Sequence, residues 1–284
     1  MTTPAVQHDD PTVGKALPDL DFRVTDALLN DYFEGLQIDR ASFDRGDTPV
    51  PSMIATAADD FHRWSRFAQD KGHLWMRQQW AFDAPLRQGV AYVAHATIED
   101  IYRRRDRTVV NTAMTLVDPD GATALTSKHH QSFLLDAPVE QVAFRDPAKK
   151  EGARKFEVPA GDTIEPLDRT ITLEMCGQYF HGSTSYHTDL EASQALGFRD
   201  VVVGGRMTMS YVGHLLERHF GAPWWTGGRL DVKFTNPVWP NDHITVRGVA
   251  TRPSDDDPNR QAAFAWVEKD DGTIALVATA SSPR

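Results

Sequence analysis

The sequence has a single cysteine, Cys176, among its 284 residues. One thiol cannot form an intramolecular disulfide, and a metal cluster built on cysteines is excluded as well. The segment ITLEMC reads as a strand that ends at Cys176. A cysteine in such a segment is more often a buried and unreactive thiol than a nucleophile, so we expect Cys176 to be inert.

Basic residues are also scarce, with 30 Lys and Arg against 40 Asp and Glu. This excess of negative charge argues against nucleic acid as a partner, because binding to phosphates depends on cationic side chains. The strongest basic cluster is Arg103–Arg105 with Arg107. We interpret it as a solvated strand end, while a grip on the phosphates of a nucleotide-like cofactor is the alternative.

Long hydrophobic runs are missing throughout, and a membrane-spanning helix needs about 18 or more consecutive apolar residues. The first 20 residues, MTTPAVQHDDPTVGKALPDL, contain acids and prolines where a signal peptide would be apolar. The sequence therefore predicts a cytoplasmic protein that does not contact a membrane.

What the sequence does contain is an internal repeat. FDAPLRQGVAYVAHATIEDI begins at Phe82 and FTNPVWPNDHITVRGVATRP begins at Phe234, each with a proline three residues later. Further along, Asp-Gly turns end at Gly121 and Gly272, at nearly equal separations from the two phenylalanines. Each turn is a hairpin signal, so both copies are predicted to continue as antiparallel strands.

A segment with helical spacing of apolar residues precedes each copy, from Met53 (MIATAADDFHRWSRFAQ) and from Met207 (MTMSYVGHLLERHFG). One central helix followed by a meander of strands is an α+β pattern, the layout of a hotdog fold, here duplicated. We expect a polar tail at 1–20, a first hotdog half at 21–137, a linker at 138–166 and a second half at 167–284.

Three stretches carry a resemblance to a known family: YFHGSTSYHTDLEASQALGF (179–198), VVVGGRMTMSYVGHLL (201–216) and GGRLDVKFTNPVWPND (227–242). The second half resembles the MaoC-like hydratase and dehydratase family, and the whole chain resembles its double-hotdog members with an N-terminal dehydratase-like half. The resemblance implies hydration of a 2-enoyl-CoA thioester or the reverse dehydration of a 3-hydroxyacyl-CoA. It implies no separate cofactor, since coenzyme A is part of the substrate.

By this resemblance the active histidine of the family is His187, and the amide of Gly205 stabilises the negative charge on the thioester oxygen, with Gly204 beside it. The position of the family's catalytic aspartate is occupied by Gly182, which cannot transfer a proton. Asp189 fits the family frame as a substrate-binding residue, but an aspartate before LEASQAL is also typical of a helix N-cap.

Several residues are candidates to replace the missing carboxylate. Tyr186 is adjacent to His187 and has a proton to donate, and His181 can form a histidine pair with His187. Further candidates are Ser183, Glu174 on the preceding strand, and Asp59 or Asp60 from the first half. A metal is not expected, because three or more suitably spaced ligands are not visible.

Binding residues are less specific. Arg229 and Lys233, near the expected site entrance, are candidates for the phosphates of coenzyme A, with ordinary surface charge as the alternative. Trp239, like Trp224 and Trp225, lines either an acyl tunnel or the core. At least one of the adjacent His129 and His130 should face solvent, because neighbouring side chains of a strand point to opposite faces.

Two other functions remain open. An acyl-CoA thioesterase, or another lyase of the same fold that cleaves a C–O or C–S bond, would use Asp59 or Asp60 as its base. A non-catalytic thioester-binding or heteromeric scaffold subunit would need no base. In the leading interpretation the first half is a degenerate copy that widens the acyl pocket, which leaves one active site per chain. The sequence leaves pairing into a homo-oligomer open.

Overall fold

The computed structural model describes residues 10–43, 49–67, 73–104, 107–134, 157–181, 184–252 and 257–284. The first half contains β1 (Leu20–Arg23), α1 (Asp26–Leu36), β2 (Leu74–Phe82), β3 (Ala91–Arg104), β4 (Arg107–Val117) and β5 (Thr123–Phe133). The second half contains β6 (Gly161–Thr170), α2 (Leu173–Tyr179), α3 (Leu190–Ala195), α4 (Gly205–Phe220), β7 (Arg229–Phe234), β8 (His243–Thr251), β9 (Arg260–Lys269) and β10 (Ile274–Pro283). Short 3-10 segments lie at Arg40–Ser42, Ser52–Ala57, Phe61–Arg63 and Ala222–Thr226.

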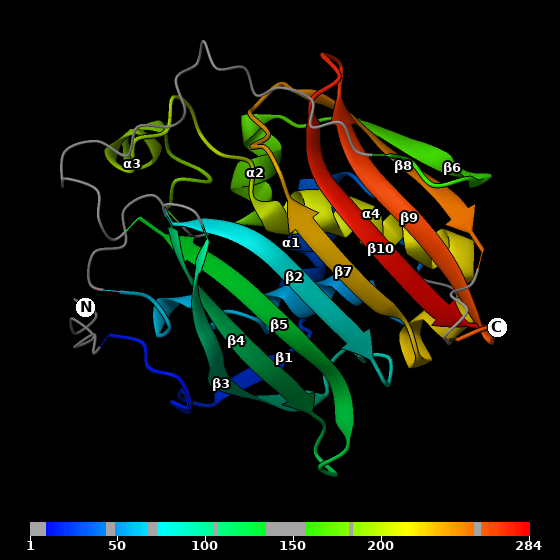
Figure 1. Ribbon diagram of the computed structural model, residues 1–284, viewed down its shortest axis with the longest axis horizontal. Coiled ribbons are helices and arrows are strands. Elements are labelled where there is room, and N and C mark those ends of the chain that lie inside the picture. Colours follow the sequence, from blue (N-terminus) through cyan, green and yellow to red (C-terminus); the bar gives the residue numbers. More distant parts are fainter. Residues whose placement is uncertain are drawn as a thin grey trace.

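The strands of the described residues join one antiparallel sheet of ten strands, in the order β1-β3-β4-β5-β2-β7-β10-β9-β8-β6 (Figure 1). This order is symmetric, because the halves meet at β2 and β7 and each strand of one half has its counterpart in the other. At the seam, Gln79 of β2 lies opposite Asp231 of β7. The predicted repeat is therefore confirmed as a pseudo-dimer within one chain, a double hotdog fold.

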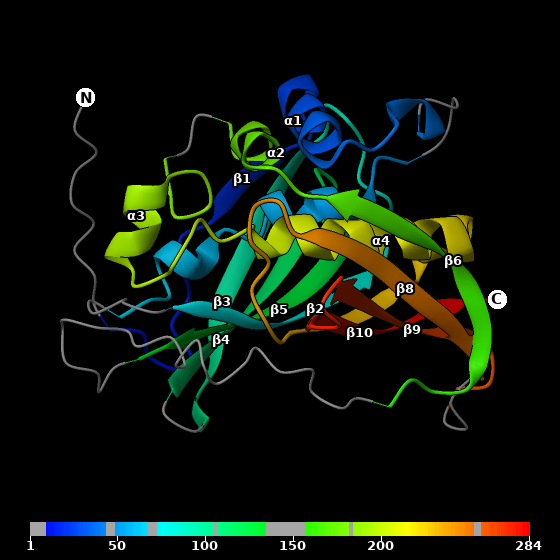
Figure 2. The same ribbon diagram turned by 90° about the horizontal axis from the view of Figure 1, so that it is seen from above.

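The sheet curves around a layer of helices (Figure 2). The helix α4 lies in the concavity, and α1 and α2 pack together on its far side from the sheet. The apolar face of α4 buries Met207, Tyr211 and Leu215 in one continuous core that also includes Trp224. The hydroxyl of Tyr211 donates a hydrogen bond to the carbonyl of Leu36 at the end of α1, 3.0 Å away.

Both predicted hairpins are present. Gly121 and Gly272 have φ angles of 81° and 78°, in the left-handed region that glycine enters without strain. They join β4 to β5 and β9 to β10. The two phenylalanines that opened the repeat, Phe82 and Phe234, end the seam strands β2 and β7.

Two expectations about secondary structure differ from what is observed. The segment after Met53 forms short 3-10 turns instead of an α-helix, and within it Asp59 bonds Gln78 of β2 while Asp60 bonds Arg206 of α4. Cys176 lies in α2, which Thr172 caps by accepting a bond from the amide of Met175. Burial raises the pKa of the Cys176 thiol to about 11, in keeping with an inert thiol.

The expected linker also ends earlier than its predicted limit. The strand β6 starts at Gly161, so residues 161–166 belong to the second half. Residues 138–156 of the linker lie outside the described residues. In the tail, the amides of Gly14 and Leu17 donate to carbonyls of β3, which ties this segment to the first half. No helix in the described ranges has the length and apolar character needed to cross a membrane.

Candidate active site

The start of α4 is shaped by two glycines. Gly204 is the N-cap and Gly205 the first helical residue, and the first amides of a helix have no partner within it. A Cβ atom on Gly204 would lie 2.4 Å from Cζ of Phe180, so a larger residue would force the Phe180 ring to move. The amides that open α4 therefore form a potential site for a negatively charged oxygen.

Both halves of the molecule contribute to the surroundings of Gly205. A Cβ atom there would lie 3.1 Å from Cε1 of Phe234 and 3.2 Å from Cε3 of Trp75. Phe234 ends β7 of the second half, and Trp75 belongs to β2 of the first. The two ring centroids are 5.1 Å apart, so aromatic edges from both sides of the seam enclose the backbone at Gly205.

His187 is held against the segment that leads into α4. Its Nδ1 atom is 2.7 Å from the carbonyl oxygen of Val202, and the amide of Val202 donates to the carbonyl of Tyr186 at 3.0 Å. Because a carbonyl oxygen only accepts, Nδ1 carries a proton. In the neutral imidazole the lone pair is then on Nε2, which is the nitrogen able to act as a base.

Aromatic rings surround this histidine. Phe180 stacks on it at 4.9 Å with an interplanar angle of 14°, and the centroid of Tyr186 is 3.9 Å away. Burial raises the pKa of Tyr186 to about 12, against a smaller opposing effect of Arg206. Tyr186 therefore holds its proton more tightly than an ordinary tyrosine and is poorly suited to the role of acid that the sequence suggested.

Two other predicted residues support this loop. Asp189 is the N-cap of α3 and accepts a hydrogen bond of 2.8 Å from the amide of Ala192, which bears out its capping role. Trp239 is buried with Phe198 and Val202 in a small apolar cluster against which Tyr186 packs. The indole of Trp239 thus supports the loop that contains His187. The guanidinium carbon of Arg199 lies over the face of this indole, 4.6 Å from the ring centroid.

The remaining candidates are placed differently. His181 is exposed just beyond α2, and Glu174 belongs to the first turn of α2 instead of a strand. Gly182 and Ser183 lie outside the described residues. Among the residues that are described, no three His, Cys, Asp or Glu side chains group as metal ligands would.

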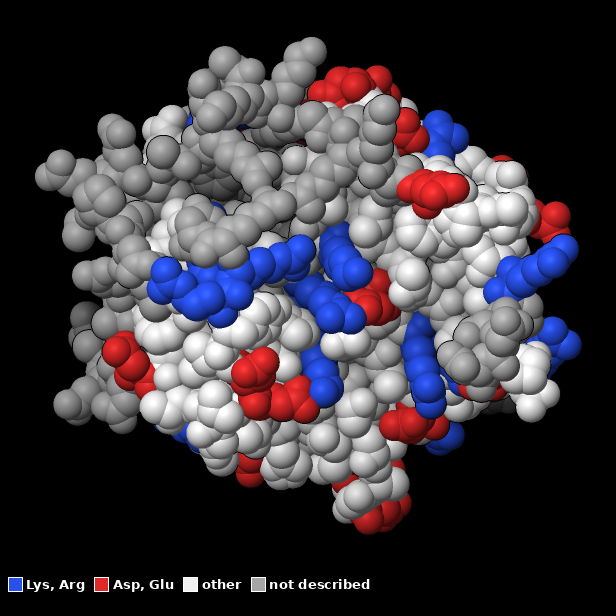
Figure 3. Space-filling view, viewed as in Figure 1, with Lys and Arg blue, Asp and Glu red and all other residues white. Residues whose placement is uncertain are grey.

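Arg229 and Lys233 are not brought together with Gly205. They alternate along β7 with the buried Leu230 and Val232, so they extend from the face of the sheet opposite α4. Figure 3 shows Lys and Arg side chains gathered across the middle of this outer face. There Arg77 bonds Asp231 across the seam, with 2.7 Å between Nε and Oδ1.

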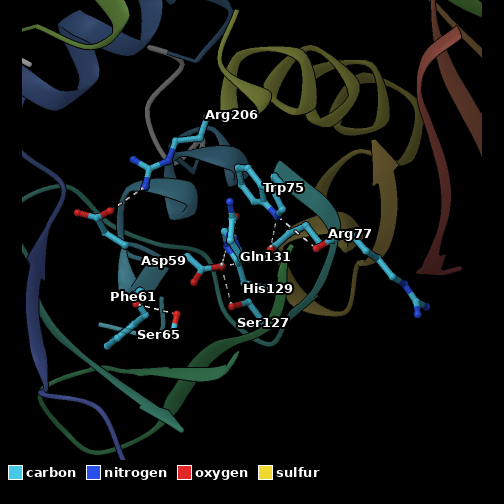
Figure 4. A network of polar contacts seen from close by, with 11 residues as sticks. Asp59, Phe61, Ser65, Trp75, Arg77, Ser127, His129, Gln131 and Arg206 are labelled. Atoms are coloured by element: carbon cyan, nitrogen blue, oxygen red, sulfur yellow. Dashed lines mark hydrogen bonds and ion pairs between the residues drawn. The ribbon is translucent and has the colours of Figure 1, made fainter. Parts of the chain in front are cut away.

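Carboxylates of the first half do reach the start of α4. Asp60 is 3.5 Å from Nη2 of Arg206 and also pairs with Arg63, so two guanidinium groups share its charge. Asp59 is fully buried and bonded to Gln78 and Ser127 (Figure 4). Sequence reasoning named both aspartates but gave no role to Trp75 or to Phe180, although Phe180 lies in the 179–198 stretch that carries the resemblance.

His129 and His130 are both buried, contrary to the expectation that one would face solvent. His129 points inward, where it stacks on Trp75. His130 points to the outer face, where the hydroxyl of Tyr102 lies 3.1 Å from its Nδ1 atom and covers it together with Arg77. Side chains of neighbouring strands, which the local sequence does not reveal, bury the second ring.

The first-half position that corresponds to Gly205 lies at the opposite end of α4, and it is closed to a substrate oxygen. The repeat register that pairs Met53 with Met207 places Pro51, which has no amide hydrogen, where the second half has Gly205. Next to it, the amide and hydroxyl of Ser52 both donate to Oε1 of Glu217, each at 2.6 Å. A carboxylate of the chain itself therefore occupies the second site.

This arrangement defines the class of protein. It is a double hotdog in which one helix N-terminus is open and the other is closed. Residues 157–264 match the sequence model of the MaoC like domain family, so the second half is similar to a MaoC-like domain. No curated protein matches the sequence.

Solved structures support the fold over nearly the whole chain. A MaoC-like dehydratase superimposes with a TM-score of 0.71 at 15% identity, covering 95% of this chain and 98% of that one. The peroxisomal multifunctional enzyme type 2 of Drosophila melanogaster gives 0.72 at 13%, covering 95% of this chain and 48% of the longer enzyme. A conserved hypothetical Mycobacterium tuberculosis protein with a double hotdog fold gives 0.61 at 13%, covering 96% of each chain.

Proposed function

We propose that the protein adds water to the double bond of a 2-enoyl-CoA thioester, or catalyses the reverse dehydration of a 3-hydroxyacyl-CoA. The observation that carries this proposal is the placement of His187. Its ring is bonded to Val202, close in sequence to the glycines that begin α4. Phe180, which stacks on His187, also contacts the position of Gly204, so the base and the oxyanion donor of this proposal belong to one neighbourhood of the half that is similar to a MaoC-like domain.

In the direction of hydration, Nε2 of His187 takes a proton from water as the water oxygen bonds to the β-carbon. The π electrons of the double bond move toward the thioester carbonyl, whose oxygen gains negative charge. The amide of Gly205 and the positive end of α4 stabilise that charge. The reaction is completed when the proton now on Nε2 of His187 is delivered to the α-carbon, which restores the neutral imidazole, and dehydration follows the same steps in reverse.

Thioester cleavage is the second candidate, because a putative oleoyl thioesterase from Lactobacillus plantarum also superimposes, with a TM-score of 0.54 at 13% identity. The structure gives it less support. Asp60 is paired with two arginines and Asp59 accepts bonds from Gln78 and Ser127, so neither carboxylate is arranged as a base for water. A binding subunit without activity is the third candidate.

The test is incubation of the purified protein with 2-enoyl-CoA esters of short, branched, aromatic and steroid-like acyl groups. Enoyl absorbance and product mass are followed together. Hydration adds one water and keeps the thioester, whereas a thioesterase releases a free thiol.

His187→Asn is the decisive variant, because its amide N–H can still bond the carbonyl of Val202 while the base is lost. We expect a fall of about 10²- to 10⁴-fold in kcat, the usual contribution of a general base. His243→Ala is the matched control, since this exposed histidine of β8 pairs with Asp270 away from the glycines. Hydration that survives His187→Asn would refute the proposal.

A further inference from the structure

A buried polar network on the first-half side of α4 has no role in the proposed reaction. It consists of Asp59, Gln78, Trp75 and His129, and we call it the Asp59 network (Figure 4). The side chain of Asp59 is completely buried, and that of His129 nearly so. A buried carboxylate is costly unless donors and a positive charge compensate it, so its retention here needs an explanation.

Two routes lead from Asp59 to the same indole. In the first, Nε2 of Gln78 donates to Oδ2 of Asp59 at 2.6 Å, and Oε1 of Gln78 accepts from Nε1 of Trp75 at 3.2 Å. In the second, Nδ1 of His129 is 3.7 Å from the same Oδ2, and its ring stacks on Trp75 at 4.5 Å and 7°. The contacts close into a ring, so the indole is fixed through its edge and its face.

The charge on Asp59 keeps this ring together. Burial opposes ionisation, but His129, Gln78 and Ser127 outweigh it and hold the pKa of Asp59 below its ordinary value. The carboxylate therefore remains an acceptor for Gln78, with Nδ1 of His129 3.7 Å from the same oxygen. The far nitrogen of His129 lies 2.9 Å from Oε1 of Gln131, which fixes the ring plane on which Trp75 rests.

Trp75 connects the Asp59 network to the candidate active site. Its Cε3 atom would be 3.2 Å from a Cβ on Gly205, and its ring packs against Phe234 on the other side of the seam. The indole therefore borders the backbone where the thioester carbonyl would bind. A shift of the Trp75 indole by a fraction of an ångström would change the space in front of the Gly205 amide, the proposed oxyanion donor.

We propose that Asp59 is a positioning residue, which fixes the indole of Trp75 against Gly205 and so makes the first half a structural part of the active site. The inference rests on the proposed function. It assigns Asp59 no contact with substrate and no proton transfer. The buried charge of Asp59 supports the shape of the thioester pocket. This role is structural and differs from that of His187, the proposed base in the second half.

The first test is Asp59→Asn, compared with Glu217→Gln as a matched control. Both variants remove a buried carboxylate from an end of the α4 layer, but Glu217 lies at the closed end. We expect Asp59→Asn to lower kcat about 10- to 100-fold with a much smaller change in KM, because only groups near the thioester carbonyl are displaced. Glu217→Gln should lower stability without changing kcat per folded molecule.

A spectroscopic measurement reports the indole directly. The near-ultraviolet circular dichroism of the wild type minus that of Trp75→Phe isolates the band of Trp75 among the 7 tryptophans. Asp59→Asn should weaken this band, and Glu217→Gln should leave it intact. If Asp59→Asn does not fold, Gln78→Met tests the same link, because it breaks the bond to the indole while the carboxylate remains.

The outcomes separate the two proposals. If the wild type hydrates no enoyl ester, the proposed function fails, while the Trp75 band and the affinity for a saturated acyl-CoA still test the positioning role. If His187→Asn abolishes hydration but Asp59→Asn keeps wild-type kcat and a wild-type band, the positioning role is overturned and the function stands.

Discussion

Replacing Ser52 with alanine should lower stability strongly and leave activity unchanged. The Ser52 hydroxyl donates to Oε1 of Glu217 at 2.6 Å and accepts from Nε1 of Trp224 at 3.0 Å. Losing a bond to a buried charge costs about 1.5 to 3 kcal/mol, and leaving a buried indole N–H unsatisfied costs about 1 to 3 kcal/mol. Ser52→Ala should therefore lower the free energy of unfolding by roughly 3 to 5 kcal/mol.

Urea unfolding, followed by fluorescence and circular dichroism, gives this difference for the wild type and the variant. The double variant Ser52→Ala/Trp224→Phe supplies an internal check. Phenylalanine keeps the ring in the core but removes the orphaned N–H, so the double variant should lose less than the sum of the two single changes. A loss below about 1 kcal/mol for Ser52→Ala, or an additive double variant, would refute this account of the closed end.

The other predictions concern the site and the outer face. Gly204→Ala should destabilise the protein by about 1 to 3 kcal/mol and reduce hydration, because its methyl group would meet Phe180 at 2.4 Å; Phe180→Leu in the same chain should restore stability in urea unfolding. Burial, with a smaller effect of Arg77, lowers the pKa of His130 from 6.5 to about 4. As pH falls, the unfolded chain therefore binds the proton at His130 before the folded chain does. Between pH 6.5 and 4 the free energy of unfolding should drop by about 3 kcal/mol. His130→Gln should flatten the measured slope of this free energy against pH. Asp189→Ala should cost about 1 kcal/mol of cap stability while KM stays within a few-fold of wild type, and a large rise in KM would instead reveal a substrate contact.

Local patterns were sufficient for much of the fold. The period-two alternation and the Asp-Gly turns located the strands and hairpins of both copies, because these signals depend only on neighbouring residues. The repeat from Phe82 and Phe234 then implied the pseudo-dimer. At the site, the frame around His187 and the glycines before Met207 indicated which segment to examine, and the capping role of Asp189 followed from the residue type.

The same local reasoning failed where distant residues decide. The segment after Met53 has helical spacing, yet it forms 3-10 turns, and its Asp59 and Asp60 contact β2 and α4, which lie far away in the sequence. The strand expected to end at Cys176 is a capped helix. The facing of Arg229 on β7 was also beyond the sequence, since a shift of one residue in a strand reverses the face to which every side chain points.

By itself, then, the sequence determined the hairpin strands, their duplication and the presence of a histidine and a glycine pair in the second half. Only the tertiary structure decided which end of α4 is open. It also decided that Trp75 of the first half would border Gly205 of the second. The physical reason is that periodicity and caps act over a few residues, whereas the site forms where two halves of the chain cross at the seam of one sheet.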